Sequence, residues 1–84
     1  AAALILVNET TLRKLNLTPI ARVAAMAIAG VDPSIMGVGP VPAMKKAVQR
    51  AGIGLNDLDL VELNEAFASQ SIACVRDLKL NPAL

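Results

Sequence analysis

The sequence of 84 residues contains no histidine, tryptophan or tyrosine, and only one cysteine and one phenylalanine, Cys74 and Phe67. A single cysteine excludes a disulfide framework, and the lack of histidine excludes metal sites of the common nitrogen and sulfur kind. Cys74 is flanked by apolar residues, which is typical of a small buried hydrophobe rather than an activated nucleophile. These residues alone cannot complete a nucleophile and base pair.

The sequence also has no large excess of charge of either sign, because the acidic and basic residues nearly balance at a formal net charge of +1. They are scattered, and no aromatic residues alternate with basic ones, so the pattern excludes a typical nucleic-acid-binding surface. The longest uncharged run, residues 33–44, is broken by glycine and proline. It is far shorter than the roughly 18 apolar residues that a membrane span needs. The sequence therefore predicts no nucleic-acid partner and no membrane span.

Hydrophobic residues, in contrast, make up 55% of the chain. A chain of this length forms one small domain at most, and such a domain buries only about 60% of its unfolded surface. The sequence therefore has more apolar surface than it can bury by itself. We expect it to be an incomplete segment that packs against further sheet and helix.

Hydrophobic periodicity predicts alternating strands and helices. Three apolar runs are typical of buried strands, at residues 1–7, 20–29 and 58–63. Helix stays open for residues 20–29, because alanine favours it. Each run precedes a predicted helix, and the first of these helices is capped by Asn8 or Thr10. The fold class is therefore α/β, with the order β-α-β-α-β-α and a parallel or mixed sheet.

Residues 30–42 are rich in glycine and proline, which predicts an irregular connection. Gly37 and Gly39 are followed by prolines and do not fit a nucleotide-binding turn, so we attribute them to the backbone freedom of a loop that approaches a site closely. The next helix begins at Pro40 or Pro42 and ends at Gly52. Its apolar positions recur at helical spacing, and its basic residues are expected to form a solvated face.

A polar pair, Asn64 and Glu65, follows the third predicted strand directly. Carboxyl ends of strands face the ligand crevice of open α/β sheets, where an asparagine can hold a water or polarise an oxygen. The alternative is structural. Asn64 could cap the next helix, and the positive end of the helix dipole could stabilise the carboxylate of Glu65.

Three motifs point to a known family. They are Asn-Glu-Ala-Phe-Ala at residues 64–68, Gly-Val-Asp-Pro at 30–33 and Met-Gly-Val-Gly-Pro-Val-Pro-Ala at 36–43. Together they resemble the thiolases, which cleave or form 3-oxoacyl-CoA. The resemblance implies a partial thiolase-like fold, a segment of a layered α-β-α-β-α sandwich. It also implies that residues 1–18 end the N-terminal thiolase domain and that residues 19–84 form the first half of the C-terminal domain.

The resemblance assigns roles residue by residue. Asn64 is expected to hold the water that stabilises an oxyanion, and Glu65 to orient active-site groups. Ala66 and Phe67 resemble part of the wall along the pantetheine arm of CoA. Met36 resembles the methionine that lines the acyl pocket. Phe67 as a plain core residue and Met36 as a gap-filler remain open alternatives.

The thiolase reaction also needs a thiolate nucleophile and a base, which the family carries elsewhere in its chain. Coenzyme A and acyl-CoA are the implied substrates, with no metal or organic cofactor. The implied partners are the remainder of the thiolase chain and further copies in a homodimer or homotetramer. The compartment is cytoplasmic for a bacterial protein and mitochondrial or peroxisomal for a eukaryotic one. A non-catalytic thiolase-like protein that binds acyl-CoA or lipid is the alternative, and a stand-alone interaction module a third.

Overall fold

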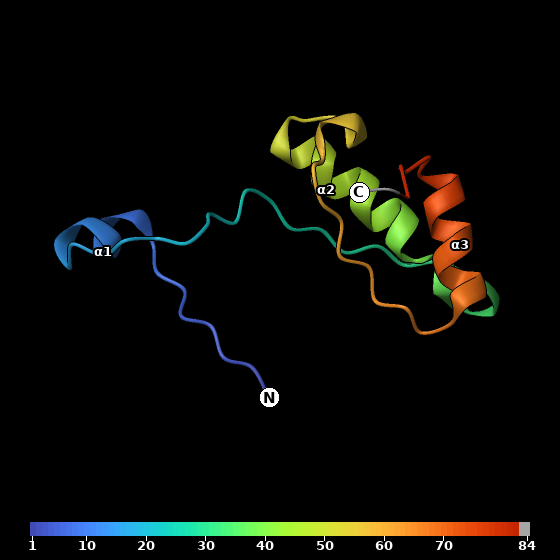
Figure 1. Cartoon of the computed structure of the whole chain (residues 1–84), viewed down its shortest axis with the longest axis horizontal. Coiled ribbons are helices and arrows are strands. Elements are labelled where there is room, and N and C mark those ends of the chain that lie inside the picture. The colour runs from blue at the N-terminus through green and yellow to red at the C-terminus, as the bar shows by residue number, and fades with distance from the viewer. Residues whose placement is uncertain (83–84) are drawn as a thin grey trace.

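The structure is a computed structural model and describes residues 1–82. It contains three α-helices and two 3-10 helices within those residues (Figure 1). In chain order these are α1 (Glu9–Lys14), η1 (Pro33–Val38), α2 (Pro40–Ala51), η2 (Leu55–Asp57) and α3 (Ala68–Asp77). No helix in this part of the chain is both long and apolar enough to cross a membrane.

The three predicted strands do not form β-structure, since no strand is assigned anywhere in residues 1–82. Residues 1–7 lead into α1 as an N-terminal segment, and residues 20–29 and 58–63 are extended connections between helices (Figure 1). A strand is defined by ladder hydrogen bonds to a neighbour, and these segments do not pair with one another. In residues 1–82 the strand positions of the predicted β-α-β-α-β-α order are therefore extended but unpaired, and the helical alternative for residues 20–29 is wrong.

Alternating burial nevertheless marks residues 25–31 as strand-like. Ala25, Ala27 and Ala29 are half-buried, whereas Met26 and Ile28 between them are 75% and 87% exposed. Side chains that alternate between two faces are typical of extended backbone. One face of this segment is covered by the chain itself, and the other is a bare apolar face.

α1 begins where the sequence predicts. The Asn8 side chain caps it, because its Oδ1 accepts a hydrogen bond from the Thr11 backbone N–H at 2.8 Å. An ion pair of 2.6 Å joins Arg13 to Glu9 one turn earlier. The helix is short and lies apart from the other helices at the end of an extended connection (Figure 1).

α2 confirms both of its predicted ends. Pro40 stands at its first position, where a missing N–H costs nothing, and Gly52 ends it in the left-handed conformation at φ 73°. Its basic side chains are exposed, but two of them are not simply solvated. Lys46 donates to the carbonyl of Ile28 at 3.0 Å, and Arg50 donates to the carbonyl of Met26 at 2.8 Å. These bonds tie α2 to the extended segment that carries Met26 and Ile28.

Replacing Gly52 by alanine in the full-length protein is expected to lower the free energy of unfolding by about 1 kcal/mol, because a Cβ is strained at positive φ. Gly30→Ala is the matched control, since a Cβ there would meet no atom of residues 1–82 within 4 Å and Gly30 does not have a positive φ. Chemical denaturation of both variants measures the difference. Equal stability of the two variants would contradict the assigned role of Gly52.

Residues 30–42 are more regular than the sequence predicts, because η1 occupies most of them and α2 starts at Pro40. Asp32 begins η1, and its Oδ1 accepts from the Ser34 N–H at 2.8 Å and from the Ser34 hydroxyl at 2.7 Å. The hydrogen bond from the Ser34 hydroxyl, and to a smaller extent the one from the Ser34 N–H, lower the pKa of the Asp32 carboxyl. Proline at the first position fixes a helical φ, so its presence here starts a helix rather than preventing one.

The only buried apolar side chains of residues 1–82 are those of Cys74 in α3 and of Leu78, the C-cap residue of that helix, at 0% and 3% exposure. α3 packs against η1 and α2, and these three elements form the compact end of the chain (Figure 1). The radius of gyration is 15.7 Å, whereas a compact domain of this length has about 12 Å. The chain is therefore extended, with a small cluster of packed helices at one end.

Candidate active-site segment

Two parts of the chain that are far apart in sequence meet where η1 contacts the first turn of α3. The contact is close at Gly37, where a Cβ would lie 2.7 Å from Cγ and 3.2 Å from Cβ of Gln70. Met36 directly precedes Gly37, and Gln70 lies three residues after Phe67. The residue after Met36 thus packs against the helix that begins directly after Phe67. We call Met36 and residues 64–67 the junction site.

The structural alternative for the polar pair is wrong. Phe67 is the N-cap residue of α3, the helix has no side-chain cap, and its first turn contains no acidic residue. Asn64 and Glu65 lie before the helix starts, in the extended connection that leads into it, and both are exposed. Helix capping therefore does not account for either side chain.

The two large apolar residues of the junction site lie outside the packed helices of residues 1–82. Phe67 is 72% exposed and Met36 is 77% exposed, so neither fills a gap in the packed helices. Every member of the junction site, Ala66 included, faces outward. An uncharged amide next to exposed apolar side chains can donate to an oxyanion or hold a water while the apolar surface contacts a ligand.

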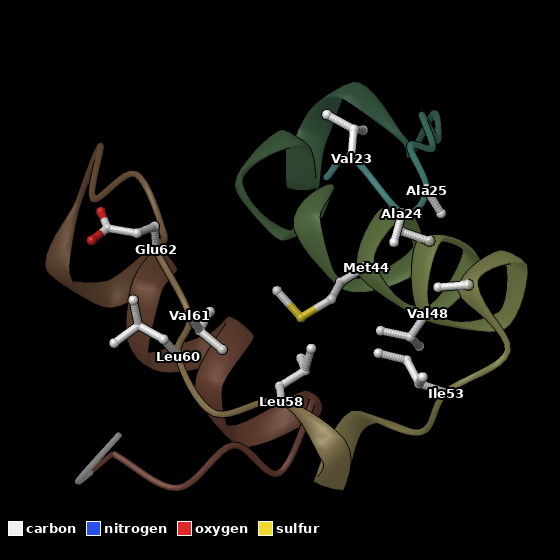
Figure 2. Close-up of a pocket in the computed structure, with 12 residues that line it drawn as sticks. Val23, Ala24, Ala25, Met44, Val48, Ile53, Leu58, Leu60, Val61 and Glu62 are labelled. Atoms are coloured by element: carbon white, nitrogen blue, oxygen red, sulfur yellow. The ribbon is translucent and has the colours of Figure 1, made fainter. Parts of the chain in front are cut away.

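A separate apolar hollow of about 350 Å³ lies between α2 and residues 58–62 (Figure 2). Met44 reaches into its middle, opposite Leu58 and Val61, while the Glu62 carboxylate points away from it (Figure 2). None of the five predicted site residues lines this hollow. Its lining is almost wholly apolar, so it suits the packing of further hydrophobic side chains rather than chemistry.

Sequence reasoning missed Gln70 and Cys74 as neighbours of the junction site, and it misjudged Gly37. Of the glycines in residues 1–82, only Gly52 has a positive φ, so backbone freedom is not what requires Gly37. Glycine is required at position 37 for lack of space, because the Gln70 side chain leaves no room for a Cβ there. The signal available in the sequence was a polar Gln70 one helical turn before Cys74, on one face of α3.

Residues 17–83 match the family described as the thiolase C-terminal domain. The chain belongs to the thiolase family. It is 58% identical over 80 residues to a 3-ketoacyl-CoA thiolase of Vibrio cholerae, a match that covers 95% of this chain and 21% of that protein. A 3-ketoacyl-CoA thiolase of Marinomonas is 56% identical over the same length and is covered to 20%.

Solved thiolase structures share the fold. The crystal structure of human mitochondrial 3-ketoacyl-CoA thiolase matches 87% of this chain with a TM-score of 0.84 and 52% identity, and 18% of that chain is covered. A second crystal structure of that human thiolase is a complex with CoA, with a TM-score of 0.85. The acetyl-CoA acetyltransferase of Bacillus anthracis is 44% identical with a TM-score of 0.84. The predicted thiolase-like fold, present as a partial segment, is therefore confirmed.

The chain spans about a fifth of the length of these relatives. Within residues 1–82 its extended segments are unpaired and many of its large apolar side chains are exposed.

Proposed function

We propose that the protein to which this segment belongs is an acyltransferase acting on acyl-CoA thioesters. Its reaction is thiolytic cleavage of a 3-ketoacyl-CoA by CoA, or the reverse condensation of acetyl-CoA. The observation that carries the proposal is the contact of Gly37 with Gln70, which packs the residue after Met36 against the helix that follows residues 64–67. The identity of 52–58% to proteins named 3-ketoacyl-CoA thiolase supports it.

The role proposed for Asn64 follows from its chemistry. Attack of a thiolate on a thioester carbonyl places negative charge on the carbonyl oxygen, and removal of an α-proton places it on an enolate oxygen. Either oxyanion is stabilised by a fixed, uncharged donor. The Asn64 amide is such a donor, acting through a water that it holds, while the thiolate and the base come from other parts of the protein.

The neighbouring residues are proposed to position the substrate. The exposed ring of Phe67 and the methyl of Ala66 form a wall along the pantetheine arm of CoA, and the exposed thioether of Met36 lines the acyl pocket. Glu65 orients groups around the reacting thioester. No metal or organic cofactor is needed in this scheme, since the CoA thioester is itself the substrate.

We further propose that residues 1–18 complete the N-terminal thiolase domain and that residues 19–84 begin the C-terminal one. The family match that begins at residue 17 supports this division, as does the position of α1 away from α2 and α3 (Figure 1). A homodimer or homotetramer is the proposed assembly.

Incubating the purified full-length protein with a 3-ketoacyl-CoA and CoA tests the function. We expect acetyl-CoA and an acyl-CoA two carbons shorter, both dependent on added CoA, as resolved by mass spectrometry. The control reaction omits CoA. Tight CoA binding without these products would instead favour the non-catalytic acyl-CoA-binding alternative.

A further inference from the structure

The contact between η1 and α3 contains a chain of polar groups as well as a steric match. Gln70 Nε2 donates to Cys74 Sγ at 3.6 Å, and Cys74 Sγ donates to the Gly37 carbonyl at 3.5 Å. Cys74 is fully enclosed at 0% exposure. Two side chains one turn apart on α3 thus contact Gly37 of η1. Gln70 fills the space where a Cβ of residue 37 would lie, and Cys74 donates to the Gly37 carbonyl; we call these two contacts the grip on Gly37.

This grip is tight because it tolerates no added atom. Ordinary van der Waals contacts of a Cβ lie at 3.4–4 Å, whereas a Cβ on Gly37 would lie only 2.7 Å from Gln70 Cγ. Sulfur hydrogen bonds are weak individually, but Cys74 and Gln70 are held on one rigid helix, so both contacts act on Gly37 at once. A shift of η1 along α3 would break them together.

Both sides of this contact are linked to junction-site residues along the chain. Met36 is bonded to Gly37, and Phe67 immediately precedes the first turn of α3 that carries Gln70. We propose that Gln70 and Cys74 are positioning residues, which fix Met36 relative to residues 64–67 and thereby set the range of acyl-chain lengths that the enzyme accepts. This inference rests on the proposed thiolase function.

The physical reason is that the size of the proposed acyl pocket depends on the distance between Met36 and residues 64–67. A displacement of about 1 Å near a reacting centre costs about 10²-fold in rate. A displacement of Met36 changes the space for the acyl chain without touching the donor at Asn64. Long and short acyl chains therefore respond unequally when the grip is altered.

The test compares kcat/KM of the full-length enzyme for acetoacetyl-CoA and for a longer 3-ketoacyl-CoA. Gly37→Ala is expected to change the ratio of the two values by at least about fivefold, since the added methyl displaces Gln70. Removing the obstructing side chain in Gly37→Ala/Gln70→Ala returns the ratio at least halfway to wild type. Gly30→Ala, where a Cβ meets no atom of the described part of the chain within 4 Å, is the control and leaves the ratio unchanged.

If the contact has only a structural role, altering it reduces the fraction of folded enzyme and lowers both kcat/KM values equally. That result overturns the inference. If Gly37→Ala does not fold, the single variants Gln70→Ala and Cys74→Ala decide, and an unchanged ratio in both overturns it as well. Wild-type turnover is measured first. Its absence overturns the proposed function and this inference together, whereas normal turnover with unchanged ratios overturns the inference alone.

Discussion

Replacing Asn64 by alanine in the full-length enzyme is expected to lower kcat by about 10²-fold, as the loss of one oxyanion donor does. The side chain lies outside α3, is exposed, and caps no helix. Its removal therefore leaves the packed helices unchanged. CoA affinity is expected to stay within a factor of about two, because the substitution removes a donor that matters mainly in the transition state.

Steady-state kinetics with titrated CoA separate the two effects, since the kcat should fall while KM for CoA stays near its wild-type value. Asn56→Ala is a matched control, because Asn56 is also exposed and lies in η2, outside the junction site. Turnover of Asn64→Ala equal to that of Asn56→Ala would contradict the role of Asn64. A selective rise in KM would assign it to substrate binding instead.

The isolated chain of residues 1–84 is expected not to fold cooperatively and to show no thiolysis. Its accessible surface is 7293 Å², whereas a folded monomer of this mass exposes roughly 4,700 Å². Large apolar side chains contribute to the excess, among them Leu4, Ile5 and Ile20 at 90%, 92% and 104% exposure. Two enclosed side chains, Cys74 and Leu78, are too small a core to offset the conformational entropy of ordering the chain.

Far-ultraviolet circular dichroism during a urea titration measures this. A gradual loss of signal without a sigmoidal transition, together with binding of a hydrophobic dye, is the expected result. The full-length protein under the same conditions is the control and should unfold in a sigmoidal transition. A sharp two-state transition of the isolated chain would contradict the interpretation of its apolar faces as surfaces covered by the rest of the fold.

The helices could be predicted from the sequence because their signals are local. Asn8, Pro40 and Gly52 each act on backbone within a few residues, and each marks a helix end in the structure. The predicted strands do not pair within residues 1–82, because strand pairing depends on neighbours that are distant in sequence. Residues 25–31 retain only the alternation of Ala27 and Ile28 between covered and exposed faces.

The site was predicted only in part for a similar reason. Asn64 and Glu65 were predicted from their place after an apolar run, and Ala66, Phe67 and Met36 by resemblance. The structure then removed the capping alternative for Asn64 and Glu65. The grip on Gly37 remained hidden, because it depends on how α3 packs against η1. Glycine in a loop has several explanations from sequence, and only the 2.7 Å approach of Gln70 selects among them.

The central claim is that Met36 and residues 64–67 form part of an acyl-CoA site, and a crystal structure of the full-length protein with bound CoA tests it most directly. The pantetheine arm is expected to lie within about 4 Å of Phe67, with the thiol end of CoA beside Asn64 and Met36. CoA bound at a place where it contacts none of these residues would contradict the account.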